Sequence, residues 1–145
     1  MKPVKNAPYL LERIPEGITV LPVERREGYG LYPNRTGELV KQLRAANVAS
    51  QYLDPPEQRR WEDLKGEVTP EMIYLGLGLN LAANAIWFGL EVGLKKVFGN
   101  KKLKVLFVRQ EADANGVVRN EWFEADGDAK GIAEAAKVLS NSDQR

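Results

Sequence analysis

Two residue types are missing from this sequence of 145 residues, which contains no cysteine and no histidine. Disulfide bonds, the usual zinc sites and the common thiol and serine–histidine nucleophile systems are therefore excluded. Carboxylates, lysines, tyrosines and a few hydroxyls remain as catalytic candidates. We expect no enzymatic activity, no cofactor and no bound metal, and a carboxylate-dependent enzyme is the catalytic alternative that the composition leaves open.

An excess of charge of one sign is also absent, because 21 basic residues face 20 acidic ones and the formal net charge is +1. No overall field attracts nucleic acid, so we expect no nucleic-acid partner. Residues 1–22 contain no apolar segment followed by a cleavage site, so the expected location is the cytoplasm. With 43% hydrophobic residues, the chain can bury one core without disulfides. We predict a single domain over 1–145, with an N-terminal arm over 1–17 and a polar tail over 140–145.

The longest apolar stretch covers residues 69–98, TPEMIYLGLGLNLAANAIWFGLEVGLKKVF, and it predicts one long helix. Thr69 can cap its start and Pro70 suits the first helical position. Lys95 and Lys96 fall in the last turn, where cations complement the helix dipole. A helix that is apolar on most of its circumference lies either in a core or in a membrane.

The polar residues of this predicted helix fall on one stripe, which contains Asn80, Asn84, Trp87 and Glu91. We interpret this stripe as a candidate surface for a partner protein. A membrane-associated protein anchored by a helix over 72–94 is the alternative, since about 19 uncharged residues in succession can span a bilayer. The two amides and the glutamate argue against that alternative.

Small residues occupy another face of the predicted helix, where Gly78, Gly89 and Gly93 recur. Each glycine costs about 1 kcal/mol of helix stability relative to alanine, so we predict that another part of the chain packs closely against them. Residues 75–78, LGLG, carry two glycines of a nucleotide-binding fingerprint. That match has little weight inside a helix, because the fingerprint requires a position between a strand and a helix.

Shorter elements flank the long stretch. Residues 18–24 read as a strand, and Pro22 places it at a sheet edge. A helix capped by Asn34 or Thr36 and ended by Asn47 precedes a strand over 48–53. A hairpin over 103–110 and 117–124 and a last helix capped by Asp126 or Asp128 follow. The predicted fold is α+β, with a small sheet of about four strands packed on the long central helix and two shorter helices.

A charged segment over 57–67 follows two prolines and reads as a linker. Arg59, Arg60 and Trp61 stand together in it. Tryptophan and arginine are enriched among the residues that dominate binding energy at protein interfaces, so these three are candidates for partner binding. The alternative is a tryptophan that folds back on the domain beside solvated arginines.

The order of these segments resembles a known family. LVKQLRAANV, RRWEDLKGE, the glycine-rich LGLGLNLAANAIWFGLEVGLKKVF, KLKVLFVRQEA and NEWFEADG, followed by a closing helix, are similar to the bacterial effector-associated constant component proteins. The resemblance covers residues 36–139 and lies in element order and texture. It implies an accessory protein of bacterial conflict or defence systems, with no catalytic residues to transfer.

Our leading hypothesis is accordingly a non-enzymatic protein-interaction or adaptor module. Its expected partner is a protein, either an effector or a second copy of the chain in a homo-oligomer. The candidate binding residues are Arg59, Arg60, Trp61, Asn80, Asn84, Trp87 and Glu91.

Overall fold

The computed structural model describes residues 1–12, 14–62, 71–78, 84–112, 114–116 and 118–141, which form a mixed α/β fold. The helices are α1 (Leu39–Ala45), α2 (Asn84–Phe98) and α3 (Ala129–Asn141). A six-stranded sheet contains, in spatial order, β1 (Lys2–Pro3), β9 (Val118–Gly127), β8 (Leu103–Ala112), β7 (Glu71–Leu77), β2 (Ile18–Leu21) and β5 (Ser50–Tyr52). A three-stranded sheet contains β3 (Glu24–Arg26), β4 (Tyr29–Pro33) and β6 (Arg59–Glu62).

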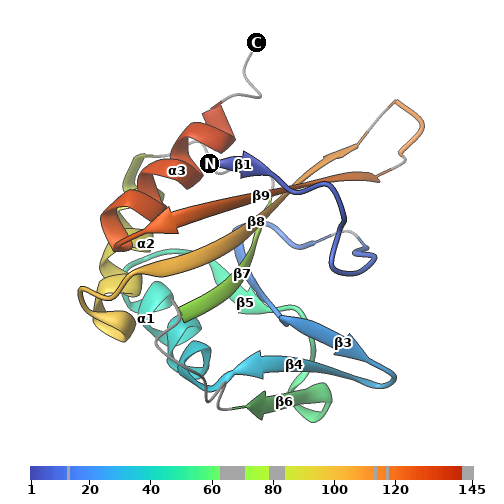
Figure 1. The fold of residues 1–145 in the computed structure, drawn as a ribbon, viewed down its shortest axis with the longest axis horizontal. Coiled ribbons are helices and arrows are strands. Elements are labelled where there is room, and N and C mark those ends of the chain that lie inside the picture. The colour runs from blue at the N-terminus through green and yellow to red at the C-terminus, as the bar shows by residue number, and fades with distance from the viewer. Residues whose placement is uncertain (13, 63–70, 79–83, 113, 117, 142–145) are drawn as a thin grey trace.

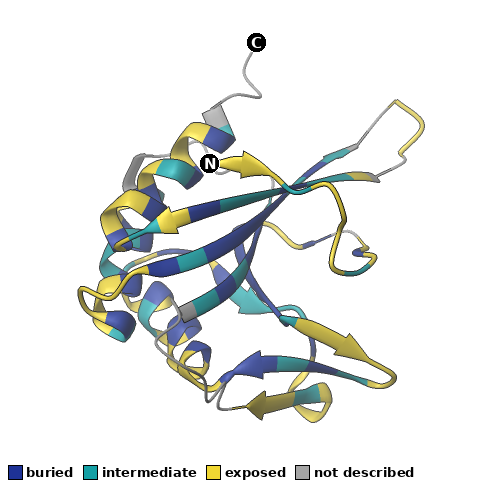
Figure 2. Cartoon of the chain, viewed as in Figure 1, coloured by how far each residue is buried: buried dark blue, intermediate teal, exposed yellow. Residues whose placement is uncertain are grey.

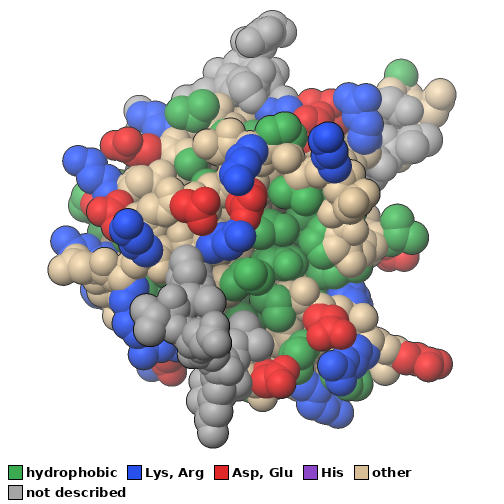
Figure 3. Space-filling view, viewed as in Figure 1, with side chains coloured by type: hydrophobic (Ala, Val, Ile, Leu, Met, Phe, Trp, Pro, Cys, Tyr) green, Lys and Arg blue, Asp and Glu red, His purple; other side chains and the backbone are tan. Residues whose placement is uncertain are grey.

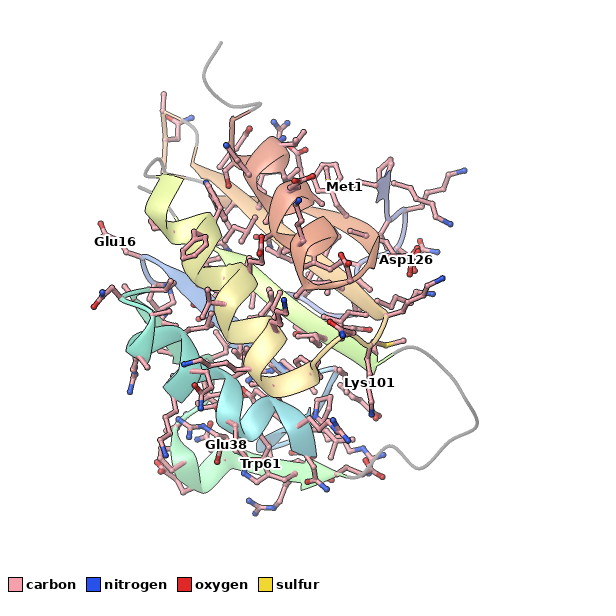
Figure 4. All side chains as sticks on the ribbon, turned by 90° about the vertical axis from the view of Figure 1, so that its left-hand side faces the viewer. Met1, Glu16, Glu38, Trp61, Lys101 and Asp126 are labelled. Atoms are coloured by element: carbon pink, nitrogen blue, oxygen red, sulfur yellow. The ribbon has the colours of Figure 1, made fainter. Side chains whose placement is uncertain are left out.

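The three helices lie together on one face of the six-stranded sheet, and the three-stranded sheet lies beside its β5 end (Figures 1 and 4). Two crossovers place the helices there, because β2 runs parallel to β5 through α1 and β7 runs parallel to β8 through α2. The two units join through the antiparallel pair β2–β7, and the β8–β9 hairpin leads into α3. No helix of the described residues covers the second face of the large sheet, which we call the helix-free face.

Successive side chains of the central strands point to opposite faces of the large sheet, and the apolar ones form one cluster on each face. In β8, Val105 and Phe107 face the helices, whereas Leu106 and Val108 face the other side. The helix-side cluster is the larger one and takes in Leu90 and other fully buried side chains of the helices. Figure 2 shows the consequence, with the middle strands of the large sheet buried and β3 of the small sheet exposed.

The predicted long helix is wrong, and with it the predicted packing of a sheet on a long central helix. Within 69–98 the structure has the strand β7 and then the helix α2, whose 15 residues make it the longest described helix. Ile73, Leu75 and Leu77 alternate towards the helix-side cluster, and β7 lies between β8 and β2. A strand buried on both faces reads as a continuous apolar run, which periodicity alone does not separate from a buried helix. Residues 69 and 70 lie outside the described part.

The predicted close packing at the glycines is confirmed for the two that lie in α2. An added Cβ at Gly89 would collide with Val48 Cγ2, and one at Gly93 would come within 2.8 Å of Leu43 Cδ2. Helix α1 and the turn after it therefore approach α2 closely at these two positions. Gly78 follows β7 instead and has no place in α2.

Several smaller expectations also needed correction. The described sheets have six and three strands rather than about four. The first long strand, β2, ends before Pro22, so the proline does not force it to the edge and it pairs on both sides. Neither Asn34 nor Thr36 caps α1 with a side chain, because a short 3-10 helix over Asn34–Glu38 leads directly into it. Residues 59–62 of the expected linker form β6.

Other expectations are confirmed. The β8–β9 hairpin lies where the sequence placed it, and Asn47 follows α1 with a positive φ of 64°. Asp128 caps α3, since its Oδ1 accepts a hydrogen bond of 2.9 Å from the Gly131 amide. None of the helices in the described residues is long and apolar enough to cross a membrane. The described part of 72–94, the segment of the membrane-anchor alternative, is divided between β7 and α2.

Candidate partner-binding surface

Strand β6 is the most exposed strand that carries an aromatic side chain in the described structure. It pairs with β4 in parallel and stands at the edge of the small sheet. Its residues alternate, so that Arg59 and Trp61 share one face while Arg60 and Glu62 share the other. Of the four, only Arg59 is partly buried. An edge strand of this kind offers backbone donors and acceptors to another strand.

Trp61 is held against the domain while much of its ring stays in water. Its side chain is 42% exposed. The ring centroid lies 5.3 Å from that of Tyr32 and 5.5 Å from that of Tyr52. Tyr52 is itself fixed, because its hydroxyl donates to the carbonyls of Thr36 and Gly37 at 2.8 Å. The tryptophan thus combines an exposed aromatic surface with a fixed orientation.

Arg59 is fixed in a similar way on the same face. Its guanidinium lies 4.3 Å from the centroid of the Tyr52 ring, a cation–π distance, and its Nε donates to the Asp54 carbonyl at 2.7 Å. Its two terminal nitrogens donate no hydrogen bond to any of the described residues. Arg59 and Trp61 therefore share Tyr52 as a support and both present unused binding capacity to solvent.

The buried carboxylate of Asp54 supports the part of the small sheet that lies beneath Arg59 and Trp61. Its side chain is 3% exposed, and its Oδ1 lies 3.0 Å from Nη2 of Arg25 in a salt bridge. Its Oδ2 accepts a hydrogen bond of 2.8 Å from the Tyr32 hydroxyl. An added Cβ at Gly30 would collide with the same Oδ2, so the carboxylate packs directly on the backbone of β4. This network ties β3, β4 and the segment after β5 together beneath Arg59 and Trp61.

The same network is poorly suited to acid–base catalysis near neutral pH. Burial raises the pKa of Tyr32, and the hydrogen bond to Asp54 adds to the increase. Burial likewise raises the pKa of Tyr9, whose hydroxyl donates to the Pro22 carbonyl at 2.6 Å. Both phenols therefore stay protonated far above pH 7, whereas a general base is most effective with a pKa near the working pH. The cluster reads as a structural support.

The expected polar stripe is not assembled as the helical stepping predicted. Trp87 is 4% exposed and belongs to the helix-side core, because α2 starts at position 84 and turns this residue towards the sheet. Glu91 lies half-buried on α2. Asn84 starts α2 with a side chain outside the described part, and Asn80 lies outside the described residues altogether. Trp87 is therefore a core residue and does not share the exposed face of β6 with Arg59 and Trp61.

Residues 75–78 occupy a different place from the one expected, since they end β7 and precede α2. A strand–glycine–helix order is the context that a nucleotide fingerprint needs. Gly78, however, is already engaged, because its amide donates to the Gly17 carbonyl at 2.8 Å. An added Cβ there would collide with the Pro15 carbonyl. These glycines therefore allow the N-terminal arm to pack closely against the end of β7.

The helix-free face of the large sheet carries an aromatic group that the sequence did not single out. Tyr9 meets Trp122 edge-on at 5.5 Å, and Tyr74 lies 6.2 Å from Trp122. The indole Nε1 of Trp122 is buried without a hydrogen-bond partner among the described residues. Figure 3 shows apolar side chains gathered over this face. The alternation of Leu106 and Val108 in β8 was the signal that could have predicted a second apolar face.

Two amide side chains fix the N-terminal arm across this face. Gln110 Oε1 accepts from the Ile14 amide at 2.7 Å, and its Nε2 donates to the Glu12 carbonyl at 2.7 Å. Asn120 Nδ2 donates to the Leu11 carbonyl at 2.8 Å. The arm is thus part of the packed structure where it crosses β8 and β9.

Comparison with protein-family models, with curated proteins and with solved structures finds no match. The resemblance to the effector-associated constant component proteins therefore stays a prediction.

Proposed function

We propose that the chain is a protein-interaction module that receives an extended segment of a partner protein along β6. The observation that carries this proposal is the pair of Arg59 and Trp61, which share one face of an edge strand and one support, Tyr52. Strand addition supplies affinity through main-chain hydrogen bonds and specificity through alternate side chains. Following the resemblance above, the partner would be an effector protein to which this chain is an accessory.

The chemistry of the surface favours a particular kind of segment. The two terminal nitrogens of Arg59 form a planar fork that matches a carboxylate. Trp61, two residues further along, offers an apolar ring for an aliphatic or aromatic side chain at the corresponding alternate position of the added strand. Because Tyr52 already restricts both side chains, binding loses little side-chain entropy. The preferred segment therefore carries an acidic residue two positions from an apolar one.

A library of random peptides displayed on phage, selected against the immobilised chain, tests the proposal without knowledge of the natural partner. We expect selected peptides to shift the backbone NMR signals of Arg59–Glu62 and to contain an acidic residue near an apolar one. Trp61→Ala and Arg59→Ala should each weaken such a peptide about tenfold or more, as expected for dominant interface residues.

The matched control is Phe88→Ala, because Phe88 is an aromatic residue of α2 that is 68% exposed and lies on the helix layer. This variant should leave peptide affinity unchanged. Selected peptides that bind α2 or the helix-free sheet face, or that bind the Trp61→Ala variant as tightly as the parent, would contradict the proposed function.

A further inference from the structure

The edge of β6 is self-complementary, and from this we infer that two copies of the chain pair through it in an antiparallel dimer. The inference uses the same edge as the proposed function but depends on a different observation, the order of charges in Arg59–Glu62. Arg60 and Glu62 are exposed on one face of the strand. No ion pair of Glu62 exists within the described residues.

Symmetry limits the ways in which this strand can meet its own copy. Two antiparallel edge strands that continue one sheet are related by a two-fold axis perpendicular to that sheet. Directly opposed side chains then lie on the same face, so each residue can oppose only itself or a residue an even number of positions away. The four residues of β6 therefore allow few registers.

Only one of these registers pairs opposite charges. Centring the axis on Trp61 places the two Trp61 side chains opposite each other and sets Arg60 against Glu62 of the second copy, twice by symmetry. Centring it on Arg60 opposes two arginines, and centring it on Glu62 opposes two glutamates. Opposite charges and aromatic pairs stabilise cross-strand positions, whereas like charges destabilise them. The sequence thus selects the register centred on Trp61.

The contacts that Arg60 makes within its own chain leave part of its guanidinium available for the dimer. Arg60 lies 5.4 Å from the Tyr29 ring centroid, and its Nη1 donates to the carbonyls of Glu57 and Arg59. Within the described residues its Nη2 makes no hydrogen bond, so this nitrogen is available to a carboxylate on the neighbouring strand. Because the contact is short, the dimer should be reversible and weak, in the class of transient interfaces.

Sedimentation equilibrium at low ionic strength over a series of concentrations up to roughly millimolar tests the inference. The parent should show a reversible monomer–dimer equilibrium. Glu62→Arg sets arginine against Arg60, and Arg60→Glu sets an acid against Glu62, so each variant should weaken dimerisation about tenfold or more. Glu134→Arg on the exposed face of α3 is the matched charge control and should dimerise like the parent.

Mixing the two single variants gives the sharpest outcome. Two copies of either variant repel each other. In a mixed pair, Arg60 of the Glu62→Arg variant faces Glu62 of the Arg60→Glu variant, and the two introduced residues, which have opposite charges, also face each other. The mixture should therefore form a heterodimer although each component alone is monomeric, and the double variant Arg60→Glu/Glu62→Arg should dimerise like the parent.

The inference would be overturned if the parent stays monomeric over the whole concentration series, or if Glu62→Arg and Arg60→Glu each dimerise as well as the parent. The peptide test of the proposed function remains independent of this result, because peptide binding is measured on the parent at concentrations far below those at which a weak dimer forms. Peptide binding with no dimer removes the present inference alone, and a dimer with no peptide binding removes the proposed function alone.

Discussion

The two sheets of this molecule differ in what their strands bury. In the large sheet, β8 is covered on both faces, and Val105, Leu106, Phe107 and Val108 are all buried in succession. In the small sheet, every residue of β3 is exposed and β6 is mostly exposed. Burial of apolar area supplies most of the folding free energy, whereas exposed, pre-oriented side chains supply binding free energy. The comparison places the main core in the large sheet, and the proposed function places recognition on the exposed strand β6 of the small one.

The largest expected effect is a loss of stability in the large sheet. Phe107 is fully buried between β7 and β9 on the helix side. Phe107→Ala should destabilise the chain by about 3 to 5 kcal/mol, because it removes apolar contacts and leaves a cavity. Unfolding by urea, followed by circular dichroism, measures the change. A loss below about 1 kcal/mol would show that this sheet does not hold the main core.

The contact between α1 and α2 gives the next effect. Gly89→Leu inserts a side chain against Val48 and the Ala46 carbonyl, and the loss should be about 3 kcal/mol. Gly131→Ala in the exposed part of α3 is the control, since an added Cβ there would meet the exposed Asp128 side chain, whose Oδ1 lies at 3.3 Å and needs to shift only slightly. Alanine there should be neutral or slightly stabilising, because it favours the helix. Equal melting temperatures for the two variants would argue against the close contact.

Alkaline pH should destabilise the chain through its buried phenols. Burial raises the pKa of both Tyr9 and Tyr32, so the native state keeps protons that the unfolded chain releases near pH 10. Stability is therefore unaffected by these groups below about pH 10 and falls above it, by roughly 1.4 kcal/mol per pH unit for each tyrosine. Urea unfolding at about pH 9 and pH 11 measures the difference. A flat profile would mean that neither phenol is buried.

Tyr32→Phe separates the support of the small sheet from the core. It removes the hydrogen bond to Asp54 Oδ2 while Arg25 still holds Oδ1, and it should cost about 1 to 2 kcal/mol. The variant should also lose less stability between the two alkaline pH values than the parent, because one of the buried phenols with a raised pKa has been removed. Unchanged stability together with an unchanged alkaline slope would contradict the role given to this hydroxyl.

The sequence predicted the ends of the fold better than its middle. The β8–β9 hairpin and the Asp128 cap depend on neighbouring residues, and local patterns identify them. The strand β7 was missed because Ile73, Leu75 and Leu77 stand among other apolar residues, so that burial on both faces hides the alternation. Its identity is fixed by its pairing with β8 and β2, which the local pattern does not contain.

The candidate surface was predicted in part. Residue types alone drew attention to Arg59, Arg60 and Trp61. Their geometry was not predictable, because Tyr52 and the Asp54 carbonyl reach them from another part of the chain. Position 87 is also a tryptophan, but Trp87 is buried whereas Trp61 is exposed. The division of the predicted long helix into β7 and α2 explains this difference in exposure.

Among the destabilising substitutions, the smallest expected loss of stability belongs to Trp61, and it decides the comparison between the sheets. Trp61→Ala removes contacts with Tyr32 and Tyr52 from a side chain that is already 42% exposed, so the loss should be about 1 kcal/mol. The same substitution at Trp122, which is 4% exposed, should cost about 3 to 5 kcal/mol. Urea unfolding of both variants provides the two values on one scale. If Trp61→Ala costs as much as Trp122→Ala, the small sheet is core rather than recognition surface, and the separation of stability from binding fails. If it costs little but abolishes peptide binding, the exposed ring of Trp61 is held in place for a partner.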